Sequence, residues 1–204
     1  MCRIRRTGVR VSFPAAEAPW SRRRRRRWQQ MPRRRGNGSR TVVDTTFRTW
    51  NATAVLRDDH KKLRQLFWRY LEMVPEKAGG MKARLFEAIQ KSLIIHATIE
   101  EEIFYPAFEE ESRKNLRVRE IISAACESHR RCKHLLQEVL SMEPQDEGFD
   151  AKVRVLGEKV GIHIEEQEEV LHPIFEGLPK KLQNEVSSDL RSRKMELEGE
   201  YDLE

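Results

Sequence analysis

The stretch His96-Ala-Thr-Ile-Glu100-Glu-Glu-Ile-Phe-Tyr-Pro106 places a histidine and a glutamate four residues apart in a segment whose apolar spacing predicts a helix. Residues i and i+4 lie on one helical face, so an imidazole nitrogen and a carboxylate oxygen can reach the same ion. The pattern recurs 67 residues later as His163-Ile-Glu-Glu-Gln167-Glu-Glu-Val-Leu-His-Pro173. The two copies share the histidine, the acidic run and the closing proline. Their chemical difference is Gln167 at the position of Glu100.

Charge divides the 204 residues into two unequal parts. Residues 1–40 hold 14 Arg and one acidic residue, a net charge of +13, whereas the remaining 164 residues carry −7. No apolar run approaches the ~20 residues that a membrane-spanning helix needs. The excess of charged residues over Gly and Pro favours a soluble helical protein. We expect no membrane partner.

The Arg-rich segment, residues 1–45, has no apolar periodicity, and its like charges repel one another. We expect it to be a disordered segment that precedes the folded part. Three interpretations remain open: a basic tail that binds nucleic acid or anionic lipid, a transit peptide, or a segment upstream of the true start, with Met31 as one candidate. Apart from this tail, we expect no nucleic-acid partner.

The cysteine spacing argues for a reducing compartment. Cys126 and Cys132 lie six residues apart on one expected helix, so their Cα atoms would be ~9 Å apart, too far for a disulfide bond. The spacing also does not suit a zinc-binding cysteine pair. We therefore expect a cytoplasmic protein.

The rest of the chain is expected to be all-α. Apolar residues recur at steps of three and four over about 50–74, 81–110, 116–142 and 150–176, and breaks fall at Pro75, Gly79-Gly80 and residues 143–148. Four such helices with short connections predict an up-down-up-down four-helix bundle over residues 46–178. A shorter amphipathic helix and a tail are expected over 179–204.

Each expected bundle helix carries one histidine on its inner stripe, and the residues are His60, His96, His129 and His163. A histidine on an apolar stripe is commonly a hydrogen-bonded core residue. Here, however, four of the chain's six histidines fall on such stripes, one per helix and at matching places in both halves, which favours a metal site. The helical angles predict that His134 faces solvent and that His172 faces solvent or caps its helix end.

Imidazoles with a carboxylate suit iron, manganese or zinc. We expect the neighbouring acids to form a solvated face, and the alternative is that they accept hydrogen bonds that orient the ligand imidazoles. These acids are Glu101, Glu102, Glu165, Glu168 and Glu169. Tyr105 is expected to be a packing residue, and Tyr70 lies on an inner stripe from which it could approach the site.

These residues carry a family resemblance. The order of one His, then His-x-x-x-Glu, then one His, then His-x-x-x-Gln, with Glu-Glu-Ile-Phe-Tyr-Pro106 after the first motif, resembles the hemerythrin-like (HHE cation-binding) family over about residues 52–178. The resemblance implies a non-haem iron site, expected to hold two ions, that binds or senses O₂, NO or iron. It carries the family's ligands onto His60, His96, Glu100, His129 and His163, and its sixth ligand onto Gln167.

Gln167 departs from the family's glutamate. Its neutral carbonyl oxygen cannot bridge two ions as an anion, so we expect weaker binding of one ion and less stabilisation of the ferric state. Glu166 is a candidate substitute, and a single ion is the alternative occupancy. Manganese or zinc in place of iron stays open.

Two other functions stay open beside the binding or sensing of a small ligand. One is a di-iron redox enzyme or an enzyme that repairs iron centres, although repair proteins of related fold carry a cysteine-containing N-terminal domain that residues 1–45 do not resemble. The other is a metal-free helical interaction protein, which Gln167 would permit. The sequence gives no indication of a protein partner.

Overall fold

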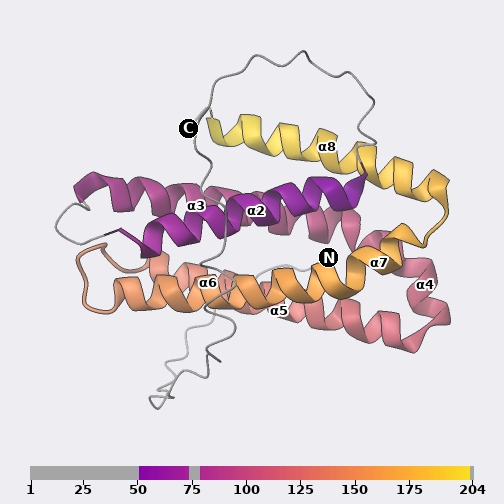
Figure 1. Cartoon of the computed structure of the whole chain (residues 1–204), viewed down its shortest axis with the longest axis horizontal. Helices are drawn as coiled ribbons and strands as arrows, with labels where there is room; N and C mark the ends of the chain where they lie inside the picture. The colour runs from indigo at the N-terminus through magenta and orange to yellow at the C-terminus, as the bar shows by residue number, and fades with distance from the viewer. Residues whose placement is uncertain (1–50, 74–78, 203–204) are drawn as a thin grey trace, which may run out of the picture. The chain divides into compact units, whose positions relative to one another are not determined.

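The fold was taken from a computed structural model, which describes residues 51–73 and 79–202. This part of the chain is all-helical, as the sequence predicts (Figure 1). The expectation of a disordered segment over residues 1–45 falls outside the described residues. Among the described residues, no helix is both long enough and apolar enough to cross a membrane.

The helices begin close to the predicted positions. The long helices are α2 (Ala52–Leu71), α3 (Gly79–Ile99), α5 (Leu116–Leu140), α6 (Phe149–Glu166) and α8 (Lys180–Asp202). Side chains at two of the starts satisfy backbone N–H groups that have no partner within the helix. Asn51 accepts a hydrogen bond from the Ala54 N–H at the start of α2, and Asn115 accepts bonds from two N–H groups at the start of α5.

Short helical pieces extend α3 and α6. The first extension consists of the π-helix η2 (Glu100–Phe104), the 3₁₀-helix η3 (Pro106–Phe108) and α4 (Glu109–Lys114). The second consists of the π-helix η4 (Gln167–Leu171) and α7 (His172–Glu176). A π turn therefore starts at the fourth residue after each motif histidine, which the sequence analysis did not predict.

The helices pack as pairs (Figure 1). α2 packs along α3, α5 packs along α6, and α2 also contacts α6. α8 lies against α2 and α3. At 23 residues, α8 is longer than the sequence suggested. It is tied to α2 by a buried hydrogen bond from the Ala52 N–H to Ser187 Oγ, 2.8 Å long, and by an ion pair between Lys194 and the buried Asp59.

The buried apolar residues form two clusters on either side of the histidines. Along α2, Leu56 belongs to one cluster and Leu63 to the other, with His60 between them. Along α5, Ala125 and Cys132 flank His129 in the same way. The four predicted inner histidines thus lie in a polar layer between two apolar layers, which exclude water from it.

Candidate metal centre

The Glu100 carboxylate lies at the centre of the polar layer and is fully buried. Glu100 Oε2 lies 3.4 Å from His96 Nε2, 3.0 Å from His129 Nε2 and 3.6 Å from His163 Nε2. Glu100 Oε1 lies 3.9 Å from His60 Nε2. The structure therefore brings together one histidine from each of α2, α3, α5 and α6 around the glutamate that the sequence singled out.

The five side chains form two groups that share Glu100. In the first group, His60, His96 and Glu100 offer ligand atoms that all lie within 4.8 Å of one another. Glu100, His129 and His163 form the second group by the same measure. Two nitrogens bound at right angles to one ion at ~2.1 Å would lie ~3 Å apart. The 2.9 Å between His129 Nε2 and His163 Nε2 fits that spacing.

The pKa shifts of Glu100, His96 and His163 favour the protonation states that bind a cation. Burial alone would raise the pKa of Glu100, but the surrounding imidazoles outweigh burial and hold this pKa well below its usual value. Burial also lowers the pKa of His96 well below its usual range and lowers that of His163. An ionised carboxylate and neutral imidazoles are the protonation states that metal ligands need.

Glu168 orients His60 from outside the central cluster. His60 Nδ1 donates to Glu168 Oε1 at 2.8 Å, and both terminal nitrogens of Arg64 donate to the Glu168 carboxylate at 3.0 Å. An ionised carboxylate only accepts hydrogen bonds, so the proton of His60 is held on Nδ1. Nε2 is then the nitrogen that faces Glu100.

The other half repeats this arrangement. His129 Nδ1 donates to Glu101 Oε1 at 2.9 Å, and Lys133 donates to both oxygens of Glu101 at 2.8 and 2.7 Å. Arg64 and Lys133 each lie four residues after the histidine whose carboxylate partner they hold. For Glu101 and Glu168 the structure favours the alternative interpretation over a solvated face. Each orients the histidine of the opposite half, because its position next to 100 or 167 faces the neighbouring helix.

These carboxylates also change the acidity of the two histidines. Burial lowers the pKa of His129, but hydrogen bonds to Glu100 and Glu101 outweigh it and raise the pKa to about 9. Burial opposes charge on His60 as well, and bonds to Glu100 and Glu168 raise its pKa. A cation that binds to either histidine must therefore displace a proton.

Gln167 points into the layer and is almost completely buried. Its amide nitrogen donates to Tyr105 Oη at 3.3 Å, and its Oε1 has no hydrogen-bond partner among the described residues. Glu166, the candidate substitute, is exposed. The regular α-helix up to Glu166 turns that side chain outward, so Glu166 is not among the side chains that the structure gathers here.

Tyr105 is part of the layer, whereas its sequence position predicts only a packing role. Burial raises its pKa well above the usual value, so its hydroxyl keeps its proton and donates to Glu100 Oε2 at 3.1 Å. Tyr105 Oη also lies 3.2 Å from His129 Nε2. Tyr70 does not approach the site, because its hydroxyl donates to Asp150 at 2.7 Å.

His172 is fully buried, which corrects the prediction that it faces solvent or caps a helix end. Its ring stacks on His60, with centroids 5.6 Å apart and planes 7° apart. The π-helix η4 explains the change, since its wider turn shifts the helical phase of every later residue. Steps of four and three from His163 lead through Gln167 to Val170 and predict that Val170 faces inward. Its 37% exposure has the same cause. His134 has a 73% exposed side chain, as predicted.

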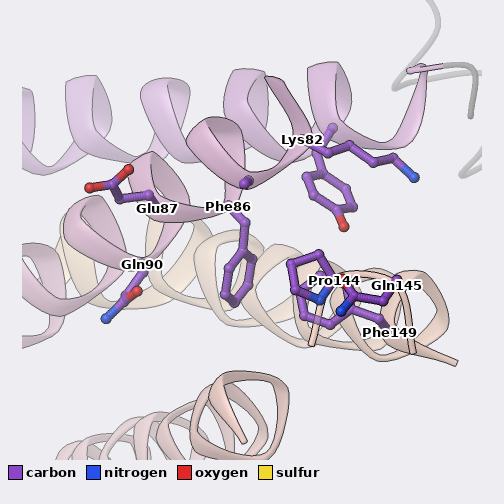
Figure 2. A pocket seen from close by; sticks show the side chains of 9 residues that line it. Lys82, Phe86, Glu87, Gln90, Pro144, Gln145 and Phe149 are labelled. Carbon is purple, nitrogen blue, oxygen red and sulfur yellow. The ribbon is translucent and has the colours of Figure 1, made fainter. Parts of the chain in front are cut away.

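A pocket of about 320 Å³ lies apart from this layer (Figure 2). Residues of α2, α3 and α6 line it together with Pro144 and Gln145 of the connection before α6. The Phe86 ring points from α3 toward Phe149 (Figure 2), and the two ring centroids lie 5.4 Å apart. No histidine lines the pocket, so it plays no part in the candidate centre.

Comparison with known proteins identifies the fold family. The sequence matches the hemerythrin HHE cation-binding domain family over residues 51–175. The chain belongs to this family. The match starts one residue before α2 and ends within α7, so it contains all four inner histidines, Glu100 and Gln167. No curated protein matches the sequence.

A solved structure supports the hemerythrin HHE fold. It is the crystal structure of a hemerythrin HHE cation-binding domain-containing protein from Mycobacterium kansasii. The two chains superpose with a TM-score of 0.61 over 74% of this chain and 88% of the other, at 21% sequence identity. At this identity the likeness shows a shared fold.

Membership of a cation-binding family calls for a test of whether the side chains fit an ion. Among the described residues, several buried site atoms have no hydrogen-bond partner, namely His60 Nε2, both nitrogens of His96, Glu100 Oε1, Gln167 Oε1 and both nitrogens of His172. A buried polar atom without a partner costs ~1–3 kcal/mol. A bound cation would satisfy nitrogen and oxygen atoms of this kind, so the residues fit a metal centre.

Proposed function

We propose that this hemerythrin-family chain is a non-haem iron protein that binds or senses O₂, NO or iron. The observation that carries the proposal is the buried Glu100 carboxylate with four histidine nitrogens within 4 Å. His60 and His96 would hold one ion and His129 and His163 a second, with Glu100 shared and Gln167 offering its carbonyl oxygen. Manganese and zinc accept the same donors.

The chain's own residues prepare the site in three ways. Glu168 and Glu101 keep a proton on Nδ1 of His60 and His129, which leaves Nε2 directed at the centre. Tyr105 donates to Glu100 and limits its rotation. The two apolar layers exclude bulk water. A pair of iron ions bound there would supply one-electron redox chemistry and open coordination positions for a diatomic ligand.

The neutral side chain of Gln167 affects the oxidation state of the iron that would bind here. With glutamine at 167, Glu100 is the only carboxylate among the proposed ligands. Each ferric ion carries one more positive charge than a ferrous ion, so a site with fewer anions favours the ferrous state. We therefore expect the bound iron to be more stable in the ferrous state than in the ferric state.

We also propose the arrangement of the helices around the centre and the cellular compartment of the protein. The four histidine-bearing helices are taken to run up-down-up-down over residues 46–178, with α8 in the 179–204 segment as an addition, and the compartment is taken to be the cytoplasm. The packing of α2 on α3 and of α5 on α6 supports two helical hairpins, and the cysteine spacing supports a reducing compartment.

The test is ligand binding by iron-loaded protein. Wild type, His96→Ala and His134→Ala are loaded anaerobically with Fe²⁺, freed of excess iron, and titrated with NO while the visible absorption spectrum is recorded. We expect new absorption bands in wild type and in His134→Ala, whose histidine is exposed, and weaker bands in His96→Ala, which lacks a ligand of the first group. A loaded wild type whose spectrum NO leaves unchanged, or an undiminished response in His96→Ala, would contradict the proposal.

A further inference from the structure

The two motif copies correspond beyond their ligands. Tyr105 follows His96 by nine residues, and His172 follows His163 by nine residues. Each is the first residue after a π-helix and precedes a proline. The π turn brings each of these side chains into the buried layer. Positions 105 and 172 are therefore equivalent members of the two halves.

Their surroundings are equivalent as well. The Tyr105 ring lies beside His129, with centroids 5.4 Å apart, and the His172 ring lies beside His60, with centroids 5.6 Å apart. His129 and His60 are themselves equivalent, since each is held by a carboxylate from the opposite half. Each π turn thus delivers one side chain to one ion group: Tyr105 to the second group and His172 to the first.

Tyr105 and His172 differ in whether their polar atoms have hydrogen-bond partners in the protein. The Tyr105 hydroxyl has hydrogen-bond contacts with Glu100, His129 and Gln167. Both ring nitrogens of His172 are buried and have no hydrogen-bond partner among the described residues. His96, a member of the first ion group, shows the same pattern at both nitrogens. A fully buried imidazole without a polar partner is costly, so this position suits a donor for a group that protein atoms do not supply.

Gln167 creates the need for such a donor. A carboxylate at 167 would offer two oxygens, one for each ion, whereas an amide offers a single oxygen. One of the two ions therefore lacks a donor from this position. His172 stacks on His60, a member of the first group, so its imidazole lies next to the group where a nitrogen donor could replace the missing oxygen.

We propose that His172 is a metal ligand of this chain and completes the His60, His96 and Glu100 group in place of a carboxylate at position 167. The inference rests on the proposed metal centre. The nitrogens of His172 are not among the atoms that already lie within 4.8 Å of one another, so ion binding requires a rotation of its ring toward Glu100. The neutral ligand would lower the anionic charge of the site and favour divalent ions.

The first arm of the test compares metal affinities. Wild type, His172→Phe and His134→Phe are titrated anaerobically with Fe²⁺ in competition with a chromophoric chelator. Phenylalanine keeps a ring next to His60 and Phe104, and His134 provides the same substitution at an exposed histidine. We expect His172→Phe to bind one of the two ions at least tenfold more weakly, while His134→Phe matches wild type. Equal affinities of all three proteins would overturn the inference.

The second arm uses wild-type protein alone, so it decides the matter even if His172→Phe does not fold. Protein with ¹⁵N-labelled histidine is loaded with diamagnetic Zn²⁺, and the imidazole nitrogen resonances are followed by NMR. Five shifted imidazoles support the inference, and four shifted imidazoles overturn it while leaving the proposed centre intact. A wild type that binds neither Fe²⁺ nor Zn²⁺ refutes the centre and the inference together.

Discussion

Two carboxylates outside the proposed ligand set determine which imidazole nitrogen faces the ions. Glu168 and Glu101 each accept a hydrogen bond from Nδ1 of a histidine in the opposite half. Arg64 holds Glu168 in place and Lys133 holds Glu101. Burial would raise the pKa of Glu168, but hydrogen bonds from His60 and Arg64 outweigh it and lower the pKa to about 2. Glu168 therefore stays ionised at neutral pH.

Removal of this carboxylate is expected to weaken metal binding without removing a ligand. Carboxylates that orient ligating histidines contribute ~10–100-fold to affinity, so Glu168→Ala should bind Fe²⁺ or Zn²⁺ weaker by about that factor. Glu169→Ala is the matched control, because Glu169 is adjacent and exposed. Chelator competition on both folded variants measures the difference. Equal affinities in the two variants would show that Glu168 does not position His60.

Much of the candidate site could be predicted at the residue scale. The four histidines, Glu100 and Gln167 follow from spacing alone, because residues on one stripe of a helix face one direction. The partners of Glu101 and Glu168 lie on other helices. Their roles depend on helix packing, and nothing in the sequence distinguishes Glu101 and Glu168 from the glutamates beside them.

At the scale of the element, the structure differs from the prediction at the π turns η2 and η4, which change the side chains that face inward. A strict 3.6-residue period turns Val170 inward and His172 outward, and the structure has the reverse. The sequence gives one indirect signal, the proline that ends each motif copy, Pro106 and Pro173. Because π turns are rare and form where packing requires them, the spacing of apolar residues could not locate them.

The close approach of α2 and α6 depends on a glycine. A Cβ added at Gly157 would lie 2.8 Å from Phe67 Cδ1, and the Phe67 ring is buried. An overpacked core costs ~1–3 kcal/mol, whereas replacement of a helical glycine by alanine gains ~1 kcal/mol. We expect Gly157→Ala to lower the free energy of unfolding by about 1 kcal/mol.

The control for this substitution is Gly199→Ala in α8, where an added Cβ meets nothing within 4 Å. It should leave the stability unchanged or raise it by up to ~1 kcal/mol. Urea unfolding followed by circular dichroism measures both variants. If Gly157→Ala is as stable as Gly199→Ala, the contact between Gly157 and Phe67 does not limit the distance between the helices.

At the scale of the whole molecule, a polar layer lies inside a helical fold between two apolar layers. The all-helical class and the site's position follow from the stripes, since each inner histidine interrupts an apolar series on its own helix. The apolar stripes did not predict the length of α8 or its attachment to α2 through Ser187 and Lys194. These contacts join residues 135 positions apart, and polar spacing within α8 does not reveal them.

The most direct test of the metal centre is the number of ions per chain, measured by native mass spectrometry on protein loaded anaerobically with Fe²⁺. Compact folded chains acquire fewer charges than unfolded chains, so the charge-state distribution reports folding in the same spectrum. We predict two ions per folded chain, and loss of at least the ion of the first group in His96→Ala, because His96 is a ligand of that group. Folded wild-type chains that carry no ion would contradict the account.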